Sequence, residues 1–371
     1  MTRHKDPVIV YAGRFSTGEK LSGPEKTAKR IFREHSINSK ACFIQYFFDG
    51  RLYGLKQKLF GKESNNHGEN ATVLTFGLLK IFRALNQIKP DIIHIITFER
   101  FAIMFILYSM IHKTKIVYNV HGVVTYENNE LKKIPFLQRL KDRFCERLFI
   151  KRSNKLIFNS ENTIDLAEKY YRIDELKAII LPNGIDEEFR KNRISGGSGP
   201  RLKAVFMIKN ELSKTGLEFL NDFLNISESG IDLFIISQSK PGIKASEIVN
   251  VSWITPMPAL ELAEFYGNKD IFLSLNSYDT FSISTAEAMA SGLIPVITSQ
   301  TGISRYIDNG HNGFIVEYGD CTKLNEILKI IEGYNLSQKQ MIQNNAKLIY
   351  ESLAWKNVYE MYLNLYRGIA A

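Results

Sequence analysis

The stretch that decides the fold is "YDTFSISTAEAMASGLIPVITS", residues 278–299. A Ser/Thr-rich turn leads into the helical segment "AEAMA", which ends near Gly292 and continues directly into the apolar segment "LIPVI". A helix that ends at a glycine and leads into an apolar strand is typical of α/β domains with a parallel sheet. Asp279 and Glu287 lie at the two ends of the turn, which raises the question of what ligand needs an acid at each end.

Length and composition predict two domains and an anionic partner. The chain has 371 residues, is 44% hydrophobic and 23% charged, and is therefore too long for one ordinary core but normal for a globular protein. Its formal net charge is +9 and its sequence pI about 9.2. This balance suits a nucleic acid, a phosphorylated metabolite or an anionic membrane surface.

Cysteines and apolar segments indicate a cytosolic protein. Cys42, Cys145 and Cys321 lie far apart and form no CxxC pair, which argues against a zinc site or a disulfide framework. The N-terminus lacks the apolar region of a signal peptide. The most apolar run, "FAIMFILYSMI" from Phe101, is shorter than the roughly 20 residues that span a bilayer, and we expect a buried helix there.

Alternating apolar and helical segments predict two α/β domains. Strand patterns such as "PVIVYAG", "DIIHIITF", "KIVYNVHG" and "KLIFNS" are separated by helical patterns up to residue 190. The Gly- and Ser-rich residues 191–201 form a predicted linker, and the pattern restarts over residues 202–352. Residues 353–371 form an amphipathic helix around Trp355. We expect two doubly wound, Rossmann-like domains, with ligands in a crevice at the carboxyl ends of their strands.

The spacing of the two acids favours two anchors for a long ligand over an acid/base pair. If residues 279–287 were all helical, the two Cα atoms would lie about 12 Å apart, whereas cooperating glycosidase carboxylates lie roughly 5 to 10 Å apart. The backbone amides between them would form an anion site near a helix N-terminus. These amides belong to Thr280, Phe281, Ser282, Ile283 and Ser284. The alternative is that Asp279 is an N-cap and Glu287 an exposed helix residue.

Further candidate residues follow other predicted strands. Lys209 and Lys214 lie on a strand-to-helix loop and could neutralise a diphosphate, although solvated loop lysines are the alternative. His121 ends the strand "KIVYNVHG" and could contact a sugar hydroxyl or a phosphate, or be structural. The loop "GEKLSGPEK", residues 18–26, ends in a predicted helix N-terminus, and Gly23 could let its backbone approach a phosphate or an acceptor. The chain has neither the GxGxxG pattern of a dinucleotide site nor a P-loop.

The segment 135–155 predicts a basic amphipathic helix. Phe136, Leu137, Leu140, Phe144 and Leu148 form one apolar stripe, and Arg139, Arg143, Arg147 and Lys151 occupy much of the remainder. Such a helix can lie on an anionic membrane. It can equally pack on its own sheet with a solvated basic face.

Taken in order, these segments resemble the retaining glycosyltransferases of family 4. The series runs from the N-terminal Gly loop through "PDIIHI", "VYNVHG", "LIFNSE", "ILPNGID" and the lysine loop to "EAMASGLIPVI" and "NGFIV". It covers nearly the whole chain and is strongest from Ile271 to Tyr318. The resemblance implies the GT-B architecture, in which residues 1–190 bind the acceptor, residues 202–352 bind a nucleotide sugar, and the C-terminal helix crosses back to the first domain.

The resemblance also implies roles for the candidate residues. Asp279 would hold hydroxyls of the donor sugar, Glu287 the ribose hydroxyls, and the amides around Phe281–Ser284 the diphosphate. Lys209 and Lys214 would stabilise the leaving diphosphate. His121 would lie near the donor sugar, and Gly23 near the donor phosphate.

Four positions depart from the family pattern. Asp279 stands where the family usually has Glu, and Lys209 where it usually has Arg, which keeps the charge but loses the bidentate fork. Ser22 and Gly23 occupy the positions where the family has a pair of glycines, and Ser282 occupies a position where the family commonly has glycine.

The sequence thus predicts a retaining, metal-independent glycosyltransferase. It would move a sugar from a UDP- or GDP-sugar to a carbohydrate or lipid-linked acceptor in polysaccharide or glycolipid synthesis of the cell envelope. The nucleotide sugar is a substrate, and no cofactor is expected. We expect a cytoplasmic protein, peripheral on the inner face of the membrane.

Three other classes stay open on the sequence alone. One is another GT-B enzyme, such as a sugar-nucleotide epimerase; a glycogen-type phosphorylase would need a pyridoxal lysine that no motif identifies. A second is a catalytically degenerate carbohydrate-binding or scaffold subunit. The third is a nucleic-acid binder, which the spread of the basic residues and the lack of a known module argue against.

Overall fold

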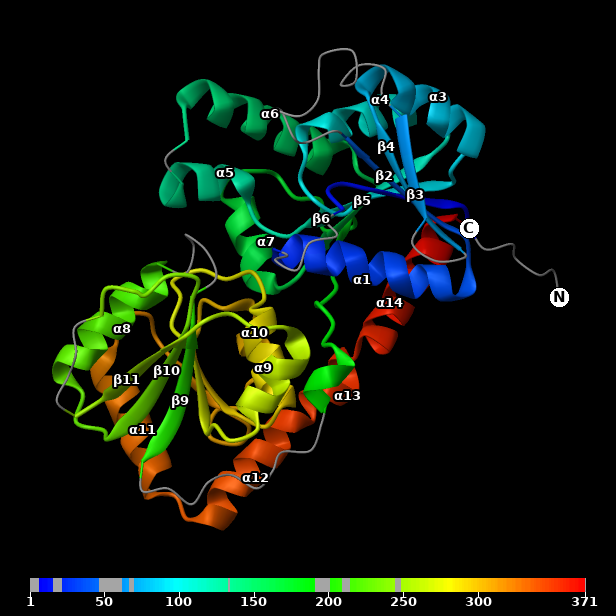
Figure 1. Cartoon of the computed structure of the whole chain (residues 1–371). Coiled ribbons are helices and arrows are strands. Elements are labelled where there is room, and N and C mark those ends of the chain that lie inside the picture. The colour runs from blue at the N-terminus through cyan, green and yellow to red at the C-terminus, as the bar shows by residue number, and fades with distance from the viewer. Residues whose placement is uncertain are drawn as a thin grey trace. The chain divides into compact units, whose positions relative to one another are not determined.

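A computed structural model describes residues 7–15, 22–46, 62–66, 70–132, 134–190, 201–208, 214–243 and 248–370. The chain forms two compact units (Figure 1). Unit 1 comprises residues up to Pro182 together with Trp355–Ala371, and unit 2 comprises Asn183–Ala354.

Unit 1 is built on an eight-stranded sheet in the order β3-β4-β2-β1-β5-β6-β7-β8. All pairings are parallel except β3 with β4. The strands are β1 (Ile9–Ala12), β2 (Ala41–Tyr46), β3 (Lys62–Asn66), β4 (Ala71–Phe76), β5 (Ile92–Ile95), β6 (Lys115–Val120), β7 (Lys155–Phe158) and β8 (Ala178–Ile180). The order reverses between β1 and β5, which makes this a doubly wound sheet with its switch point there.

Helices cover both faces of this sheet because the strands are apolar on both faces. Residues of α3 (Leu78–Ile88), α4 (Ile103–Ile111), α6 (Phe136–Arg152) and α7 (Glu161–Glu168) share one core cluster with Val10 and Ala12. Tyr11 points the other way, and its ring contacts Phe32 of α1 (Gly23–Asn38) and Tyr366 of α14 (Trp355–Ala370). The short α5 (Val124–Tyr126) follows β6.

Unit 2 is built on a six-stranded parallel sheet in the order β11-β10-β9-β12-β13-β14. The strands are β9 (Leu202–Met207), β10 (Ile231–Ile236), β11 (Asn250–Ile254), β12 (Ile271–Ser274), β13 (Ile294–Thr298) and β14 (Phe314–Val316). The order reverses between β9 and β12. The helices are α8 (Lys214–Ile226), α9 (Ala259–Tyr266), α10 (Ile283–Ala290), α11 (Cys321–Gly333), α12 (Leu336–Lys347) and α13 (Ile349–Leu353).

The boundary between the units differs from the predicted one. Residues 183–190, which the sequence assigned to the N-terminal domain, belong to unit 2. The reason is local: the Ile185 amide donates to the Leu353 carbonyl at 2.7 Å, and the Phe189 ring packs against Tyr266. Residues 191–200 of the predicted linker lie outside the described residues. The helix around Trp355 begins at that residue and belongs to unit 1.

Three strands, β3, β4 and β11, escaped the sequence pattern. β4 follows residues that the sequence left unassigned, and β11 is a largely exposed edge strand whose five residues "NVSWI" mix polar and apolar side chains. An edge strand packs on few neighbours, so its composition carries a weak strand signal.

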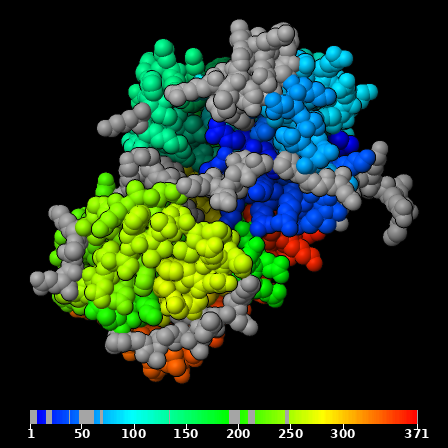
Figure 2. All heavy atoms as spheres, in the orientation of Figure 1, coloured from blue at the N-terminus to red at the C-terminus, as the bar shows by residue number. Residues whose placement is uncertain are grey.

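The apolar stripe of α6 lies on the outside of unit 1. Phe136, Leu137, Leu140 and Phe144 are 65%, 70%, 47% and 62% exposed. The helix buries a different face, formed by Asp142, Cys145, Glu146, Phe149 and Ile150. The helix does pack on its own sheet, as the alternative predicted, but it does so through this buried face and Leu148 and not through the other four residues of the predicted stripe. Figure 2 shows α6, in green-cyan, on the surface of unit 1.

The helix predicted in the run from Phe101 is α4, which is only partly buried. Phe105, Ile106 and Tyr108 face the core, whereas Met110 and Ile111 are exposed. Among the described residues, no helix combines the length and hydropathy needed to cross a bilayer.

Candidate active site

The loop from β12 to α10 has a different local structure from the predicted one. Helix α10 begins at Ile283, four residues after Asp279, so helical rise does not set the separation of Asp279 and Glu287. Ser282 is the N-cap residue, with φ of 66° in the left-handed region. The alternative that Asp279 is the N-cap is therefore wrong, although its carboxylate does bind the loop.

Asp279 occupies part of the predicted anion site with its own side chain. Its Oδ1 accepts the backbone N–H groups of Phe281 at 3.1 Å and Ser282 at 2.8 Å. Its backbone carbonyl accepts the N–H of Gly302 at 2.8 Å, which ties the loop to the segment after β13. Of the amides predicted to bind a diphosphate, those of Ile283 and Ser284 accordingly have no acceptor among the described residues. These two point out of the first turn of α10 and are the ones suited to an anion.

Glu287 is a buried carboxyl group. It is only 3% exposed and lies on α10, whose residues from Thr285 to Ala290 are all buried. The alternative that Glu287 is an exposed helix residue is therefore wrong. The alanines of "AEAMA" explain this burial, since small side chains let a helix pack closely on all sides. Burial, together with the charge of Glu287, raises the pKa of the neighbouring Tyr266 phenol well above its usual value.

The predicted lysine loop follows β9, the strand next to β12. Lys209 lies outside the described residues, and Lys214 is the first residue of α8, although its side chain is likewise not described. Gly216 brings the start of α8 close to the end of β12. A Cβ atom on Gly216 would lie 2.5 Å from Oδ1 of Asn276. The structure thus places the first turn of α8 beside the β12 loop, at the switch point of unit 2.

His121 lies one residue after β6 in unit 1 and is partly exposed. Asn119 Nδ2 lies 3.4 Å from its Nε2, and Asn159 Nδ2 lies 3.2 Å from its Nδ1. Burial of the ring and the nearby His94 lower the pKa of His121 to about 3. Because the imidazole is neutral at physiological pH, it can hydrogen-bond to a hydroxyl but adds no positive charge for a phosphate.

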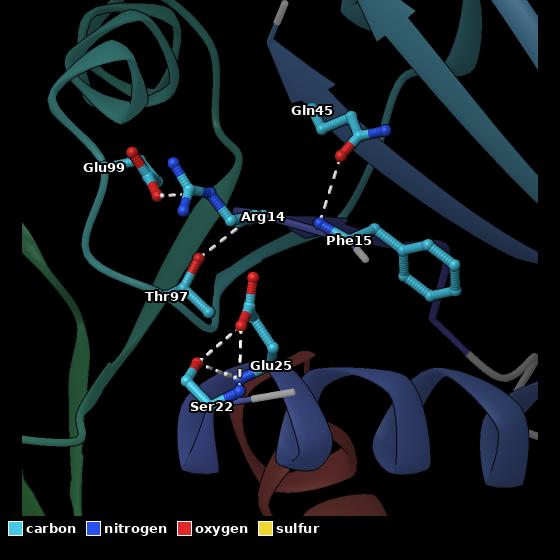
Figure 3. A network of polar contacts seen from close by, with 7 residues as sticks. All are labelled: Arg14, Phe15, Ser22, Glu25, Gln45, Thr97 and Glu99. Carbon is cyan, nitrogen blue, oxygen red and sulfur yellow. Dashed lines mark hydrogen bonds and ion pairs between the residues drawn. The ribbon is translucent and has the colours of Figure 1, made fainter. Parts of the chain in front are cut away.

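Gly23 is the first residue of α1. Ser22 caps this helix in a capping box, in which Ser22 Oγ accepts the Glu25 N–H at 3.4 Å and Glu25 Oε2 accepts the Ser22 N–H at 2.9 Å (Figure 3). The preceding residues 16–21 lie outside the described residues.

A polar network that the sequence reasoning missed lies beside Ser22 and Glu25, at the switch point of unit 1 (Figure 3). The Arg14 amide donates to Thr97 Oγ1 at 2.7 Å, and Arg14 Nε lies 3.4 Å from Glu99 Oε1. Burial, only partly offset by Arg14, raises the pKa of Glu99 to about 7. The rule that placed His121 at a strand end also applies to "AGR" after β1 and "ITFE" after β5, and would have found these residues.

Two family profiles match separate parts of the chain. The profile described as glycosyltransferase family 4 matches residues 61–189, and the profile described as glycosyl transferases group 1 matches residues 240–348. The chain belongs to this family of glycosyltransferases, as its sequence resemblance predicted. Its two parallel sheets form the GT-B fold of that family.

Similar proteins support the same assignment. The glycogen synthase of Thermodesulfovibrio yellowstonii is 30% identical over 109 residues, which are 29% of this chain and 21% of that protein. The chain thus matches only about a fifth of the length of that relative. The structure of sucrose-phosphate synthase from Thermosynechococcus elongatus is 12% identical, with a TM-score of 0.74 over 98% of this chain and 99% of that one.

A second similar structure contains a nucleotide. Anabaena Alr3699/HepE in complex with UDP is 16% identical, with a TM-score of 0.71 over 98% of this chain and all of that one. At such low identities these structures establish the fold alone.

Proposed function

We propose that this glycosyltransferase moves a sugar from a UDP- or GDP-sugar to an acceptor hydroxyl with retention of the anomeric configuration. The observation that carries the proposal is the β12–α10 connection, where the buried Glu287 lies at the switch point of unit 2 with the amides of Ile283 and Ser284, which have no acceptor within the part of the chain that the structure describes. A switch point is where doubly wound sheets bind nucleotides. The complex of Alr3699/HepE with UDP supports a nucleotide-sugar donor.

In the proposed reaction, the bond between the anomeric carbon and the phosphate oxygen breaks and its electron pair leaves with the nucleoside diphosphate. The acceptor oxygen attacks from the same face and loses its proton to an oxygen of the leaving phosphate. Lys209, Lys214 and the first turn of α10 would stabilise the negative charge that develops. Asp279 and His121 would contact the donor sugar, and Glu287 the ribose.

A donor screen tests the proposal. Purified protein is mixed with a panel of UDP- and GDP-sugars, with ligand-detected NMR for binding and slow nucleoside diphosphate release for turnover. We expect one donor to bind, with binding lost in Glu287→Ala and release lost in Lys214→Ala. Glu261→Ala on the exposed side of α9 is the matched control and should behave as wild type. Absence of binding across the panel contradicts the proposal.

The same screen distinguishes a second candidate, a degenerate carbohydrate-binding subunit. The observation that favours it is the use of Asp279 Oδ1 by the amides of Phe281 and Ser282, which removes two donors from the predicted diphosphate site. This candidate predicts donor binding without any release of nucleoside diphosphate, even with acceptors present. An epimerase, in contrast, would convert the donor sugar without releasing the diphosphate.

We propose further that the reaction needs no metal ion, because the lysine loop can supply the positive charge that a divalent cation would give the leaving group. Release of nucleoside diphosphate should continue in excess EDTA. Complete loss of release, with recovery on adding Mg²⁺ or Mn²⁺, would show that the lysines are insufficient.

The exposed face of α6 supports a membrane-bound acceptor. Phe136, Leu140 and Phe144 lie along one exposed side of the helix, and Arg147 and Lys151 continue that side toward its C-terminus. Exposed aromatic residues beside cations suit an anionic bilayer surface. We therefore propose a peripheral protein on the cytoplasmic face of the membrane, acting on a lipid-linked acceptor in polysaccharide or glycolipid synthesis.

Liposome flotation tests this surface. We expect binding to vesicles that contain anionic phospholipid at low salt, weaker binding at high salt, and loss of binding when Phe136, Leu140 and Phe144 are all changed to Ser. A matched control changes the exposed Leu336 and Met341 of α12 to Ser and should bind normally. Equal binding of both variants would mean that α6 is not the contact surface.

A further inference from the structure

The C-terminal helix carries a row of tyrosines into the interior of unit 1. Tyr359, Tyr362 and Tyr366 follow one another at spacings of three and four residues, so they share one face of α14. All three are buried. Figure 1 shows α14 beside α1, and the Tyr359 hydroxyl contacts His35 Nδ1 on that helix.

The other two hydroxyls reach the central strands. Tyr366 Oη lies 2.7 Å from His94 Nδ1 on β5, and Tyr362 Oη accepts a hydrogen bond from Asn119 Nδ2 on β6 at 3.2 Å. Asn119 Oδ1 lies 2.8 Å from His94 Nε2. The carboxamide of Asn119 is thus held from two sides, by His94 at its oxygen and by Tyr362 at its nitrogen.

The held carboxamide faces the candidate active-site histidine. Asn119 Nδ2 lies 3.4 Å from Nε2 of His121, while Asn159 Nδ2 lies 3.2 Å from Nδ1. A neutral imidazole has one nitrogen lone pair that can accept a hydrogen bond, and its other nitrogen carries a proton. Only one of the two amide groups can therefore donate to the ring, so the positions of the Asn119 and Asn159 carboxamides together bias the choice between the two tautomers.

We propose that Tyr362 is a positioning residue, which acts through Asn119 to set the tautomer and ring orientation of His121. The proposal rests on the proposed function in one respect, namely that His121 contacts the donor sugar. It makes the C-terminal helix part of the machinery of the active site, although Tyr362 and Asn119 lie 243 residues apart in the sequence. A tyrosine that merely filled the core would leave the His121 tautomer unchanged when its hydroxyl is removed.

The experiment compares Tyr362→Phe with Tyr359→Phe in the full-length protein. Each change removes one buried hydroxyl from the same helix, but the Tyr359 hydroxyl contacts His35 and not Asn119. Long-range ¹H–¹⁵N NMR spectra of the histidine-labelled protein report the tautomer of each ring, and His121→Asn assigns the His121 signals. Thermal unfolding of both variants measures the loss of stability that they share.

We expect Tyr362→Phe to shift the His121 ring nitrogens toward a mixture of tautomers and Tyr359→Phe to leave them unchanged. With the donor identified by the screen, kcat should fall about tenfold in Tyr362→Phe while KM stays within about twofold, because orientation rather than binding is lost. Identical His121 spectra in wild type and Tyr362→Phe would overturn the proposal.

The NMR result separates this proposal from the proposed function. If no donor is turned over by the wild type but Tyr362→Phe still alters the His121 tautomer, the glycosyltransferase reaction fails and the positioning role is supported. If turnover is normal in the wild type and both Phe variants lose it equally with unchanged His121 spectra, the positioning role fails and the reaction is supported.

Discussion

In each unit a glycine allows two chain segments to approach closely where the sheet reverses its order, but the two glycines differ in the atoms that surround them. In unit 1, Gly13 follows β1, and a Cβ atom there would lie 2.3 Å from Thr97 Oγ1 and 3.0 Å from the Thr97 backbone nitrogen. In unit 2, Gly216 follows β9 at the start of α8, and its Cβ would lie 2.5 Å from Asn276 Oδ1. Both glycines bring the segment after the first strand of their unit, β1 or β9, against the segment after its neighbour in the sheet, β5 or β12, where each sheet reverses its order.

The difference lies in what each glycine meets. Gly13 has φ of 146°, and its Cβ would meet both Thr97 Oγ1, which accepts a hydrogen bond from the Arg14 amide, and the Thr97 backbone nitrogen, whereas Gly216 meets the end of a side chain. The chain at the switch point of unit 1 accordingly has little freedom to move, and we call this rigid segment, which supports Arg14 and Glu99, the fixed corner. That of unit 2 can adjust around Asn276, which is compatible with the proposed nucleotide-sugar site. The following predictions test this contrast.

Replacing Gly13 should have the largest effect. Gly13→Ala combines a strained φ with a collision against the side chain and backbone of Thr97, and we expect a loss of about 3 kcal/mol or more in the free energy of unfolding. Urea denaturation measures the loss, and hydrogen exchange should show it in β1 and β5. Gly310→Ala is the matched control, since Gly310 has φ of 82° but nothing within 4 Å of its Cβ. An equal cost at both positions would mean that strain alone, without the collision, explains Gly13.

Acid should weaken the core of unit 1 through its histidines. Burial lowers the pKa of His94 to about 4 and that of His121 to about 3, both below the usual value of 6.5. At these two histidines the unfolded chain therefore binds more protons than the native one below pH 6.5, and their contribution to stability falls as the pH falls, whereas Glu99, whose pKa burial raises to about 7, contributes with the opposite sign. We expect each histidine to cost about 2 kcal/mol at pH 5.

Hydrogen exchange at pH 7 and pH 5, corrected for intrinsic rates, measures this loss in β5 and β6. His94→Gln should flatten the dependence, because glutamine does not titrate. Equal protection of these strands at both pH values would show that the histidines do not control the stability of unit 1.

The sequence predicted the strands that border both switch points, because buried parallel strands are continuous apolar runs. It also placed Asp279, Glu287 and His121 at or after strand ends. It could not predict that Asp279 would bind the amides of Phe281 and Ser282, since this depends on a four-residue turn before α10. Nor could it connect Tyr362 with Asn119, because contacts across such sequence distances depend on the packing of α14.

Replacing Gly216 should have a smaller effect on stability than replacing Gly13. In Gly216→Ala, the Asn276 side chain can rotate away, and alanine favours the helix by about 1 kcal/mol over glycine. The Asn276 backbone stays in place because its carbonyl accepts a hydrogen bond from Thr298 Oγ1 at 2.6 Å. We expect stability to change by no more than about 1 kcal/mol, while donor affinity falls. Urea denaturation and donor titration check the two expectations, and a cost as large as that at Gly13 would remove the contrast between the units.

The smallest effect is expected at Ser282, the residue that stands where the family commonly has glycine. Its φ of 66° costs an L-residue about 1–2 kcal/mol, and glycine avoids this cost. Against this, Ser282→Gly loses the contact of Ser282 Oγ with Thr285 Oγ1 at 2.8 Å and gains entropy in the unfolded chain. We expect a net change below about 1 kcal/mol in either direction.

Ser282→Ala is the matched variant, because it loses the same contact and keeps the strain. Urea denaturation should therefore find Ser282→Gly more stable than Ser282→Ala by about 1 kcal/mol. Equal stability of the two variants would mean that the turn before α10 relaxes out of the left-handed region when the hydroxyl is removed. The loop of unit 2 would then be adjustable at its backbone as well as at Asn276, which would widen its difference from the fixed corner of unit 1.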